Sequence, residues 1–355
     1  MEVKNLEGKI QTVTGLIDPD SLGITLTHEH LLYDSQVHSV NLNNASEKSI
    51  AEQPVSLENL WWVRYNMWNS IDNARYTDEN LAIKEAMRFK IAGGDTIVEM
   101  TNYGICRDPQ GLHRISRATG LNVVMGSGFY AAGSQNSETL KLKESEMAEI
   151  IIKDILIGAD GTNIRAGMIG EIGAMVPIEE FEIKSLRAAA IAQKETGAPI
   201  NIHPSHSDNL VIENIKILKD AGADLSHVVI SHCDAWDFSK EVMYEILKYD
   251  CYVEYDCFGY EGYFPEYHGR HFNMLTDEQR IKKIIELIND GYINKILISG
   301  DHCVKHALAS YGGWGYDHIL RNVVPLMKIN GMEESQIYTL MVENPRRMLT
   351  FAKTF

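Results

Sequence analysis

Two histidines separated by one residue are the first part of the chain that could do chemistry. His28 and His30 flank Glu29 where the apolar run Ile24–His28 ends. Alternate residues of a strand point to the same face, so the two imidazoles would lie side by side while Glu29 points the other way. Two neighbouring imidazoles are a chelate for a transition metal. The pair therefore predicts a metal site, if further ligands follow.

Further ligands do follow, each where a later apolar run ends. These residues are Glu171, His203, His232 and Asp301. One histidine or aspartate after a strand is more often a hydrogen-bonded residue or a helix cap than a ligand. Six such residues at the ends of five runs favour a shared site instead. A site with this many ligands could hold two divalent ions.

The fold must bring the ends of these runs together. From residue 78 onwards, helical stretches alternate with short apolar runs. We expect helices at about 78–91, 110–119, 144–157, 179–196, 208–221, 237–249 and 275–290. We expect strands at 24–28, 96–100, 122–126, 167–171, 199–203, 227–232, 251–256 and 295–301. Eight β-α units predict an α/β protein with a (β/α)₈ TIM barrel, whose catalytic groups lie at the C-terminal ends of the strands. A doubly wound open sheet is the alternative.

The other segments complete a single domain over residues 1–355, because no Pro/Gly/Ser-rich linker divides the chain. Residues 9–17 alternate like a strand, and Asp18–Ser21 then turns the chain into the first barrel strand, which predicts a short N-terminal β ribbon. Residues 35–56 are polar and predict a loop. The aromatic residues of 57–70 predict a helix with a core-facing stripe. C-terminal helices are expected at about 316–330, 333–342 and 345–352.

Composition excludes several kinds of partner. Lys and Arg number 33 against 49 Asp and Glu, a formal charge of -16, which disfavours nucleic acid and anionic membranes. Five cysteines without a CxxC motif favour a reducing compartment. The first residues lack the apolar segment of a signal peptide, and no apolar run approaches the roughly 20 residues of a membrane span. We expect a cytoplasmic protein that acts on a small molecule.

The motifs around the predicted ligands resemble those of the phosphotriesterase family of the amidohydrolase superfamily. The segments that carry this resemblance are Thr27–Leu31, Gly170–Gly173, Ile202–Pro204, Ser231–Asp234 and Ser299–His302. Four further segments are most similar to the phosphotriesterase-related protein branch, namely Gly8–Ile17, Gly158–Thr162, Tyr252–Asp256 and Tyr311–Tyr316. The resemblance covers essentially the whole chain.

The resemblance implies a binuclear metal centre. His28, His30 and Asp301 would hold the buried ion, and His203 and His232 the more exposed ion. In the best-known members a carboxylated lysine bridges the two metals. No lysine lies between residues 165 and 178 here, and Glu171 takes that place. Zinc suits these mixed nitrogen and oxygen ligands, and manganese, cobalt or iron are compatible with them.

The implied activity is hydrolysis. A hydroxide between the two ions would attack a small carboxylic ester or lactone, and Asp301 would pass the proton to the leaving group. The alternative substrate is an N-acyl amide, such as an N-acyl amino acid or an N-acyltaurine. Phosphotriester hydrolysis, and a metal-binding barrel without activity, are less favoured. A homodimer is the family-level expectation.

Three residues are candidate substrate contacts. Tyr130 follows the third strand, and Arg270 and Lys305 could pair with an anionic substrate group. Residues 257–271, after the seventh strand, are long, aromatic and rich in glycine. They predict either a lid or pocket wall over the site, or a packed surface loop.

Overall fold

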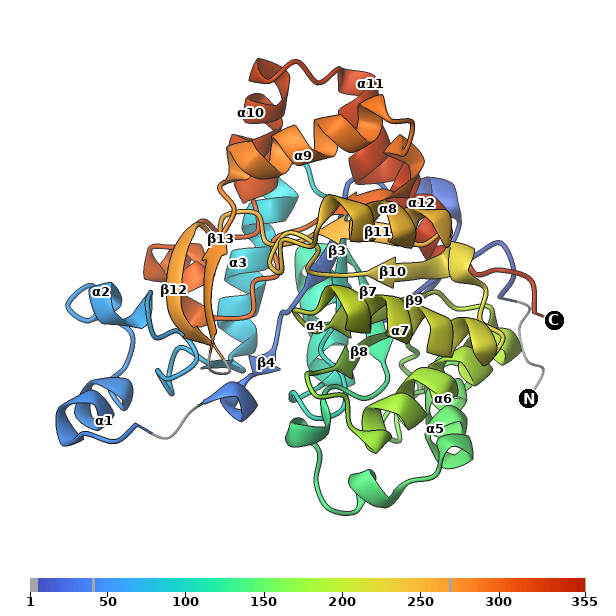
Figure 1. Ribbon diagram of the computed structural model, residues 1–355, viewed down its shortest axis with the longest axis horizontal. Coiled ribbons are helices and arrows are strands. Elements are labelled where there is room, and N and C mark those ends of the chain that lie inside the picture. The colour runs from blue at the N-terminus through green and yellow to red at the C-terminus, as the bar shows by residue number, and fades with distance from the viewer. Residues whose placement is uncertain (1–5, 40–41, 268–269, 355) are drawn as a thin grey trace.

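Eight parallel strands form the sheet at the centre of the molecule (Figure 1). The computed structural model describes residues 6–39, 42–267 and 270–354, and the side chains of residues 264–272 lie outside this description. Within it, the strands follow one another around the sheet in chain order. They are β3 (Thr25–Glu29), β6 (Thr96–Glu99), β7 (Asn122–Ser127), β8 (Met168–Ala174), β9 (Ile200–Pro204), β10 (Val228–Ile230), β11 (Tyr252–Tyr255) and β14 (Ile296–Ile298).

The first and last strands meet, so that the sheet closes into a barrel. The amide of Asp301, beyond β14, donates a hydrogen bond to the carbonyl of His28 on β3 at 3.2 Å. The hydroxyl of Ser299 reaches the same carbonyl at 2.8 Å. The predicted (β/α)₈ barrel is therefore confirmed, and the open doubly wound sheet is excluded.

Helices cover the outside of the barrel, close to where periodicity predicts them (Figure 1). They are α3 (Glu79–Ile91), α4 (Pro109–Thr119), α5 (Glu144–Leu156), α6 (Glu180–Thr196), α7 (Asp208–Asp220), α8 (Lys240–Lys248) and α9 (Asp277–Asn289). Side-chain caps explain several of their first residues. Asp108, for example, accepts a hydrogen bond from the amide of Gly111. Gly120 and Gly197 end α4 and α6 in the left-handed conformation that glycine adopts without strain.

A short hairpin closes the N-terminal end of the barrel. Strands β1 (Ile10–Thr12) and β2 (Gly15–Ile17) pair with each other, so the predicted N-terminal β ribbon is confirmed, although residues 9–17 form both of its strands and not a single one. The chain reverses within this segment because Gly15 has a φ of 130°, which other residues rarely adopt. Gln11 donates to the carbonyl of Ala166, just before β8. The hairpin therefore lies at the end of the barrel opposite to the predicted ligands.

Residues 35–70 form an excursion at one side of the barrel mouth (Figure 1). The expected loop contains a 3₁₀ turn (Gln36–His38) and α1 (Ala45–Ala51), and the expected helix is only α2 (Leu60–Val63). The core-facing aromatic stripe is wrong as well, because Trp61 is 66% exposed and Tyr65 is 56% exposed. Trp62 is buried, in a small separate core with Leu60 and Val63. The helical spacing was right only locally, since α2 packs on this excursion and not on the barrel.

Three further parts complete the fold. After β11 the chain forms a hairpin of β12 (Gly262–Tyr267) and β13 (Arg270–Met274). The short strands β4 (Tyr33–Asp34) and β5 (Arg75–Tyr76) pair at the base of the excursion. The expected C-terminal helices appear as α10 (Val324–Ile329), α11 (Glu334–Tyr338) and α12 (Asn344–Leu349), with π-helical turns beside them. None of the helices in the described ranges has both the length and the apolar character needed to cross a membrane.

Candidate metal centre

All six predicted ligands meet at the C-terminal mouth of the barrel. His28 and His30 lie at the end of β3, Glu171 within β8 and His203 within β9. His232 and Asp301 follow β10 and β14. The last two have φ angles of 56° and 42°, which are uncommon for residues other than glycine and occur often at functional sites. Five of the six side chains are buried, and that of Asp301 is 14% exposed.

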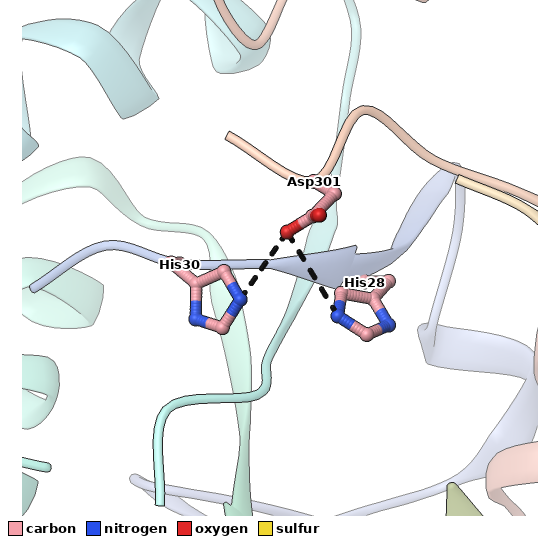
Figure 2. A group of neighbouring side chains, drawn as sticks. All are labelled: His28, His30 and Asp301. Carbon is pink, nitrogen blue, oxygen red and sulfur yellow. Dashed lines mark ion pairs between the residues drawn. The ribbon is translucent and has the colours of Figure 1, made fainter. Parts of the chain in front are cut away.

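His28, His30 and Asp301 form one half of the centre. Figure 2 shows one carboxylate oxygen of Asp301 facing a ring nitrogen of each histidine. Oδ1 lies 3.3 Å from Nε2 of His30 and 3.9 Å from Nε2 of His28. His28 Nε2 and Asp301 Oδ1 are buried atoms that make no hydrogen bond. Two buried polar atoms without a partner, turned toward the same point, fit a cation held between them.

His203 and His232 form the other half, and Glu171 lies between the halves. Glu171 Oε2 is 2.8 Å from His203 Nδ1 and 3.5 Å from His232 Nε2. Its other oxygen, Oε1, is 3.5 Å from His30 Nε2. Oε2 also lies 3.6 Å from His28 Nε2, so the carboxylate lies between the two halves, where a bridging ligand would.

Each of the four histidines directs its second ring nitrogen outward to a residue of another strand or loop. His28 Nδ1 lies 3.1 Å from Ser231 Oγ, and His30 Nδ1 lies 2.9 Å from Thr101 Oγ1. His232 Nδ1 lies 3.0 Å from Asp256 Oδ1, and His203 Nε2 lies 3.3 Å from the hydroxyl of Tyr130. Such partners set ring orientation and tautomer. No spacing in the sequence singles out Thr101 or Ser231 for this role.

The centre attracts positive charge. Burial alone would lower the pKa of His28, but its hydrogen bond to Glu254 and the charge of Glu171 raise that pKa to about 10. Burial would raise the pKa of Glu171, yet the histidines around it, with His203 foremost, hold that pKa well below its usual range. Carboxylates that stay ionised and draw protons onto imidazoles are suited to cations, which displace those protons when they bind.

Glu29 has a role that the strand alternation did not reveal. It points away from His28 and His30, as expected, and is completely buried. Its carboxylate accepts hydrogen bonds from the Ser299 hydroxyl, the Gly300 amide, and both the amide and the ring of His302. These residues surround Asp301 in the sequence. The middle residue of the histidine pair therefore holds the turn that presents Asp301.

A cleft of about 530 Å³, open to solvent, is lined by five of the six residues, all except His28. Tyr130 lines it, as predicted for a substrate contact. Tyr33, His38, Met67, Trp68, Ala235, Trp236, Cys257, Tyr260, Met274 and Cys303 line it as well. Residues from the segment after β11 are among them, so part of this segment is pocket wall.

The predicted substrate contacts Lys305 and Arg270 have different outcomes. Lys305 lies outside the pocket lining, because its ammonium group pairs with the carboxylate of Asp72. The structure therefore does not bring Lys305 to the site. The side chain of Arg270 lies outside the described residues. Within the described side chains, no lysine or arginine lines the cleft.

A TIM barrel with histidines and carboxylates gathered at its mouth defines a class of metal-dependent hydrolases. Comparison with protein families matches residues 8–349 to the Phosphotriesterase family. The chain belongs to the phosphotriesterase family, and it is a metal-dependent hydrolase of that family.

Similar proteins extend over the whole chain. The N-acetyltaurine hydrolase of Xenopus tropicalis is 40% identical over 350 residues, which are 98% of this chain and 100% of that protein. The crystal structure of a resiniferatoxin-binding protein from Rhodobacter sphaeroides has a TM-score of 0.93 and 34% identity, with 97% and 96% of the two chains covered. A mutant phosphotriesterase-like lactonase from Deinococcus radiodurans has a TM-score of 0.74 and 26% identity, with 96% and 99% covered.

Proposed function

We propose that this protein hydrolyses the amide bond of a small N-acyl compound of the N-acetyltaurine type. The single observation that carries this proposal is 40% identity, over the full length of both chains, to an N-acetyltaurine hydrolase. The gathered centre of six residues supports it, because its imidazoles and carboxylates are the donors that would hold ions able to activate water toward an amide carbonyl. The comparison therefore favours the amide alternative over the ester or lactone that we expected first.

We assign the six residues as ligands of two divalent ions. His28, His30 and Asp301 would hold one ion and His203 and His232 the other, with Glu171 shared between them. His28 Nε2 and Asp301 Oδ1 make no hydrogen bond, and the Glu171 oxygens face both halves. Zinc is our expected ion because imidazole and carboxylate ligands suit it. When bound, such ions lower the pKa of water and polarise a carbonyl oxygen.

Other steps of the reaction, namely proton transfer and enclosure of the substrate, would depend on residues of the chain. Water adds its oxygen to the acyl carbon, the carbon–nitrogen bond breaks, and the proton must reach the departing amine. Asp301 would move that proton, since its Oδ1 atom faces the centre while its side chain reaches the cleft. Tyr130 and the other aromatic walls would enclose the substrate and limit its size.

Ester or lactone hydrolysis is a second candidate, supported by the likeness to the Deinococcus radiodurans lactonase. The same groups would attack either carbonyl, and an ester has the better leaving group. The six residues alone therefore do not distinguish amide from ester hydrolysis, and the two activities have to be compared by their rates.

A substrate panel tests the proposal. Purified protein is loaded with zinc, manganese or cobalt and assayed on N-acetyltaurine, N-acetyl amino acids, lactones, carboxylic esters and a phosphotriester, with and without chelator. We expect the highest kcat/KM on an N-acetyl compound, chelator-sensitive and restored by metal. A kcat/KM higher on lactones or esters than on every amide would overturn the assignment.

A further inference from the structure

His203 differs from the other three histidines in the hydrogen-bond partners that follow its second ring nitrogen. The partners of the other three lead to a carboxylate. Thr101 donates to Glu99 at 2.5 Å, Ser231 donates to Glu254 at 2.8 Å, and Asp256 is itself a carboxylate. Behind His203 the hydroxyl of Tyr130 leads instead to an imidazole, because Tyr130 lies 3.1 Å from Nε2 of His38.

The three side chains form a continuous chain along one wall of the cleft. Tyr130 is 2% exposed, His38 is 6% exposed and His203 is 7% exposed. The Tyr130 ring meets both imidazole rings edge to face, with centroids 5.6 Å from that of His38 and 5.0 Å from that of His203. Burial and ring packing leave these side chains little freedom, so that a hydrogen bond at one end constrains the ring at the other.

Hydrogen-bond directions follow from the orientation of His203. Its Nδ1 atom faces the centre, 2.8 Å from Glu171 Oε2 and 2.8 Å from His232 Nε2. With Nδ1 acting as the ligand atom, the ring proton sits on Nε2 and is donated to the Tyr130 oxygen. Tyr130 then donates its own hydroxyl proton to His38 Nε2. His38 Nε2 thus fixes the hydroxyl, and the hydroxyl fixes the tautomer of His203.

The excursion at the barrel mouth anchors His38. Ser35 donates from its amide and its hydroxyl to the carbonyl of Ala74, at 2.9 Å and 3.0 Å. The amide of His38 donates back to the Ser35 carbonyl at 2.9 Å, which forms the 3₁₀ turn. The turn is thereby tied to the segment before α3, and its histidine is held against Tyr130, just beyond the third barrel strand.

We propose that His38 is a positioning residue for the metal centre, which acts through the Tyr130 hydroxyl to hold His203 with Nδ1 toward the cluster. This proposal rests on the assignment of His203 as a metal ligand. It gives a residue of the excursion, outside the barrel, a role in holding a predicted metal ligand in place.

The test is a double-mutant cycle read out as metal affinity. Zinc affinity is measured by chelator competition for wild type, His38→Leu, Tyr130→Phe and the double variant. Each single variant should weaken binding of the ion assigned to His203 and His232 about tenfold to a hundredfold, as loss of a hydrogen-bond partner behind a metal ligand typically does. The double variant should be no weaker than the weaker single variant, because both remove the same chain. Effects that multiply, or unchanged affinity in His38→Leu, would overturn the proposal.

Two further variants separate positioning from folding. His38→Gln keeps an acceptor for the Tyr130 hydroxyl and should restore affinity to within about threefold of wild type. Gln36→Ala changes an exposed residue of the same turn and should leave affinity unchanged. A loss in Gln36→Ala as large as that in His38→Leu, or no rescue by glutamine, contradicts the proposal. Metal affinity is measured without substrate, so these results stand apart from the substrate panel.

Discussion

Glu171 decides whether the two halves of the centre can share one ligand. Its two oxygens reach both halves, at 3.5 Å from His30 Nε2 and 2.8 Å from His203 Nδ1. A glutamate provides this carboxylate directly, whereas a lysine would first have to react with carbon dioxide. In the proposed bridging role the negative charge would be essential, since it would offset two cations in a buried site.

Glu171→Gln should therefore lose metal as well as activity. An amide of nearly the same shape cannot supply the bridging charge, so we expect less than two bound ions per chain and a fall in kcat of roughly a hundredfold or more. Elemental analysis and steady-state kinetics check both. Glu180→Gln, on the exposed start of α6, is the matched control. Wild-type metal content in Glu171→Gln would refute the bridging assignment.

Glu29 supports Asp301 without contacting the cleft. It accepts hydrogen bonds from three residues around Asp301, including the His302 ring at 2.7 Å. Burial would raise the pKa of Glu29, but the charge of His302 lowers that pKa below its usual range. The pair is therefore ionised, buried and directly coupled to the turn that carries Asp301.

Glu29→Gln should destabilise the fold and displace Asp301. Removing one partner of a buried ion pair typically costs about 3–5 kcal/mol, because the other charge stays buried. We expect a loss of this order in denaturant unfolding, together with weaker metal binding. Glu58→Gln, on the exposed part of the excursion, should change the free energy of unfolding by less than about 0.5 kcal/mol. Equal stability of the two variants would contradict this role for Glu29.

At the scale of elements, α9 ties the ends of β10 and β11 together. Arg280 on α9 is completely buried, and its Nε atom donates to Asp234 at 2.6 Å. Asp234 in turn accepts from the amides of Asp256 and Cys257, at 3.1 Å each. Asp256 then holds the ring of His232. One helix thus sets the position of His232, a predicted ligand, through Asp234 and Asp256.

Arg280→Met should be among the most destabilising single changes in the chain. It leaves the carboxylate of Asp234 buried without its cation, which costs about 3–5 kcal/mol. The matched control is Lys282→Met on the same helix, where the ion pair with Glu278 is exposed and contributes about 0.5 kcal/mol or less. Urea unfolding of the two variants gives the comparison. A smaller effect at Arg280 than at Lys282 would show that Arg280 does not stabilise the buried carboxylate of Asp234.

The 3₁₀ turn Lys305–Ala307 beyond β14 carries a buried histidine that should make stability depend on pH. Burial, followed by the charge of Arg64, lowers the pKa of His306 from 6.5 to about 4. The unfolded chain therefore binds a proton that the folded chain excludes between these values. Stability from this residue is fully present above pH 6.5 and is lost as the pH falls toward 4, by about 3 kcal/mol in all.

His306→Asn removes this titration while it keeps a donor for Asn73, which lies 3.1 Å from the His306 ring. The free energy of unfolding of the variant should fall less steeply than that of wild type between pH 6.5 and 4. Chemical denaturation at several pH values measures the difference. Parallel curves across that interval would mean that His306 is not the responsible group.

At the scale of the whole molecule, the two ends of the barrel have different tasks. An apolar cluster fills the N-terminal end and brings together Ile10 of the hairpin, Val124 and Met168 of the sheet, and Leu349 of α12. The C-terminal mouth holds the polar centre, with the excursion of residues 35–70 and the β12–β13 segment beside it (Figure 1). Stability and chemistry are thus separated along one axis. A cytoplasmic location and a homodimer stay predictions.

Much of this design was predictable because it depends on local order. Apolar periodicity is a short-range signal, so the eight strands and seven helices around them were located closely. In a barrel the strand ends share one mouth, which is why the ends of five runs identified His28, His203, Asp301 and the other three residues together. The excursion was not predictable in this way, because α2 packs on its own small core and not on the barrel.

The amino-acid sequence by itself thus determined the class of fold, the order of the elements and the residues that gather at the mouth. Only the tertiary structure decided what stands behind each of them. The four contacts join residues far apart in the sequence. The separations are 71 residues for His30 and Thr101, 203 for His28 and Ser231, 73 for His203 and Tyr130, and 92 for Tyr130 and His38. Such contacts depend on how strands and loops lie side by side in space, and no local pattern encodes them.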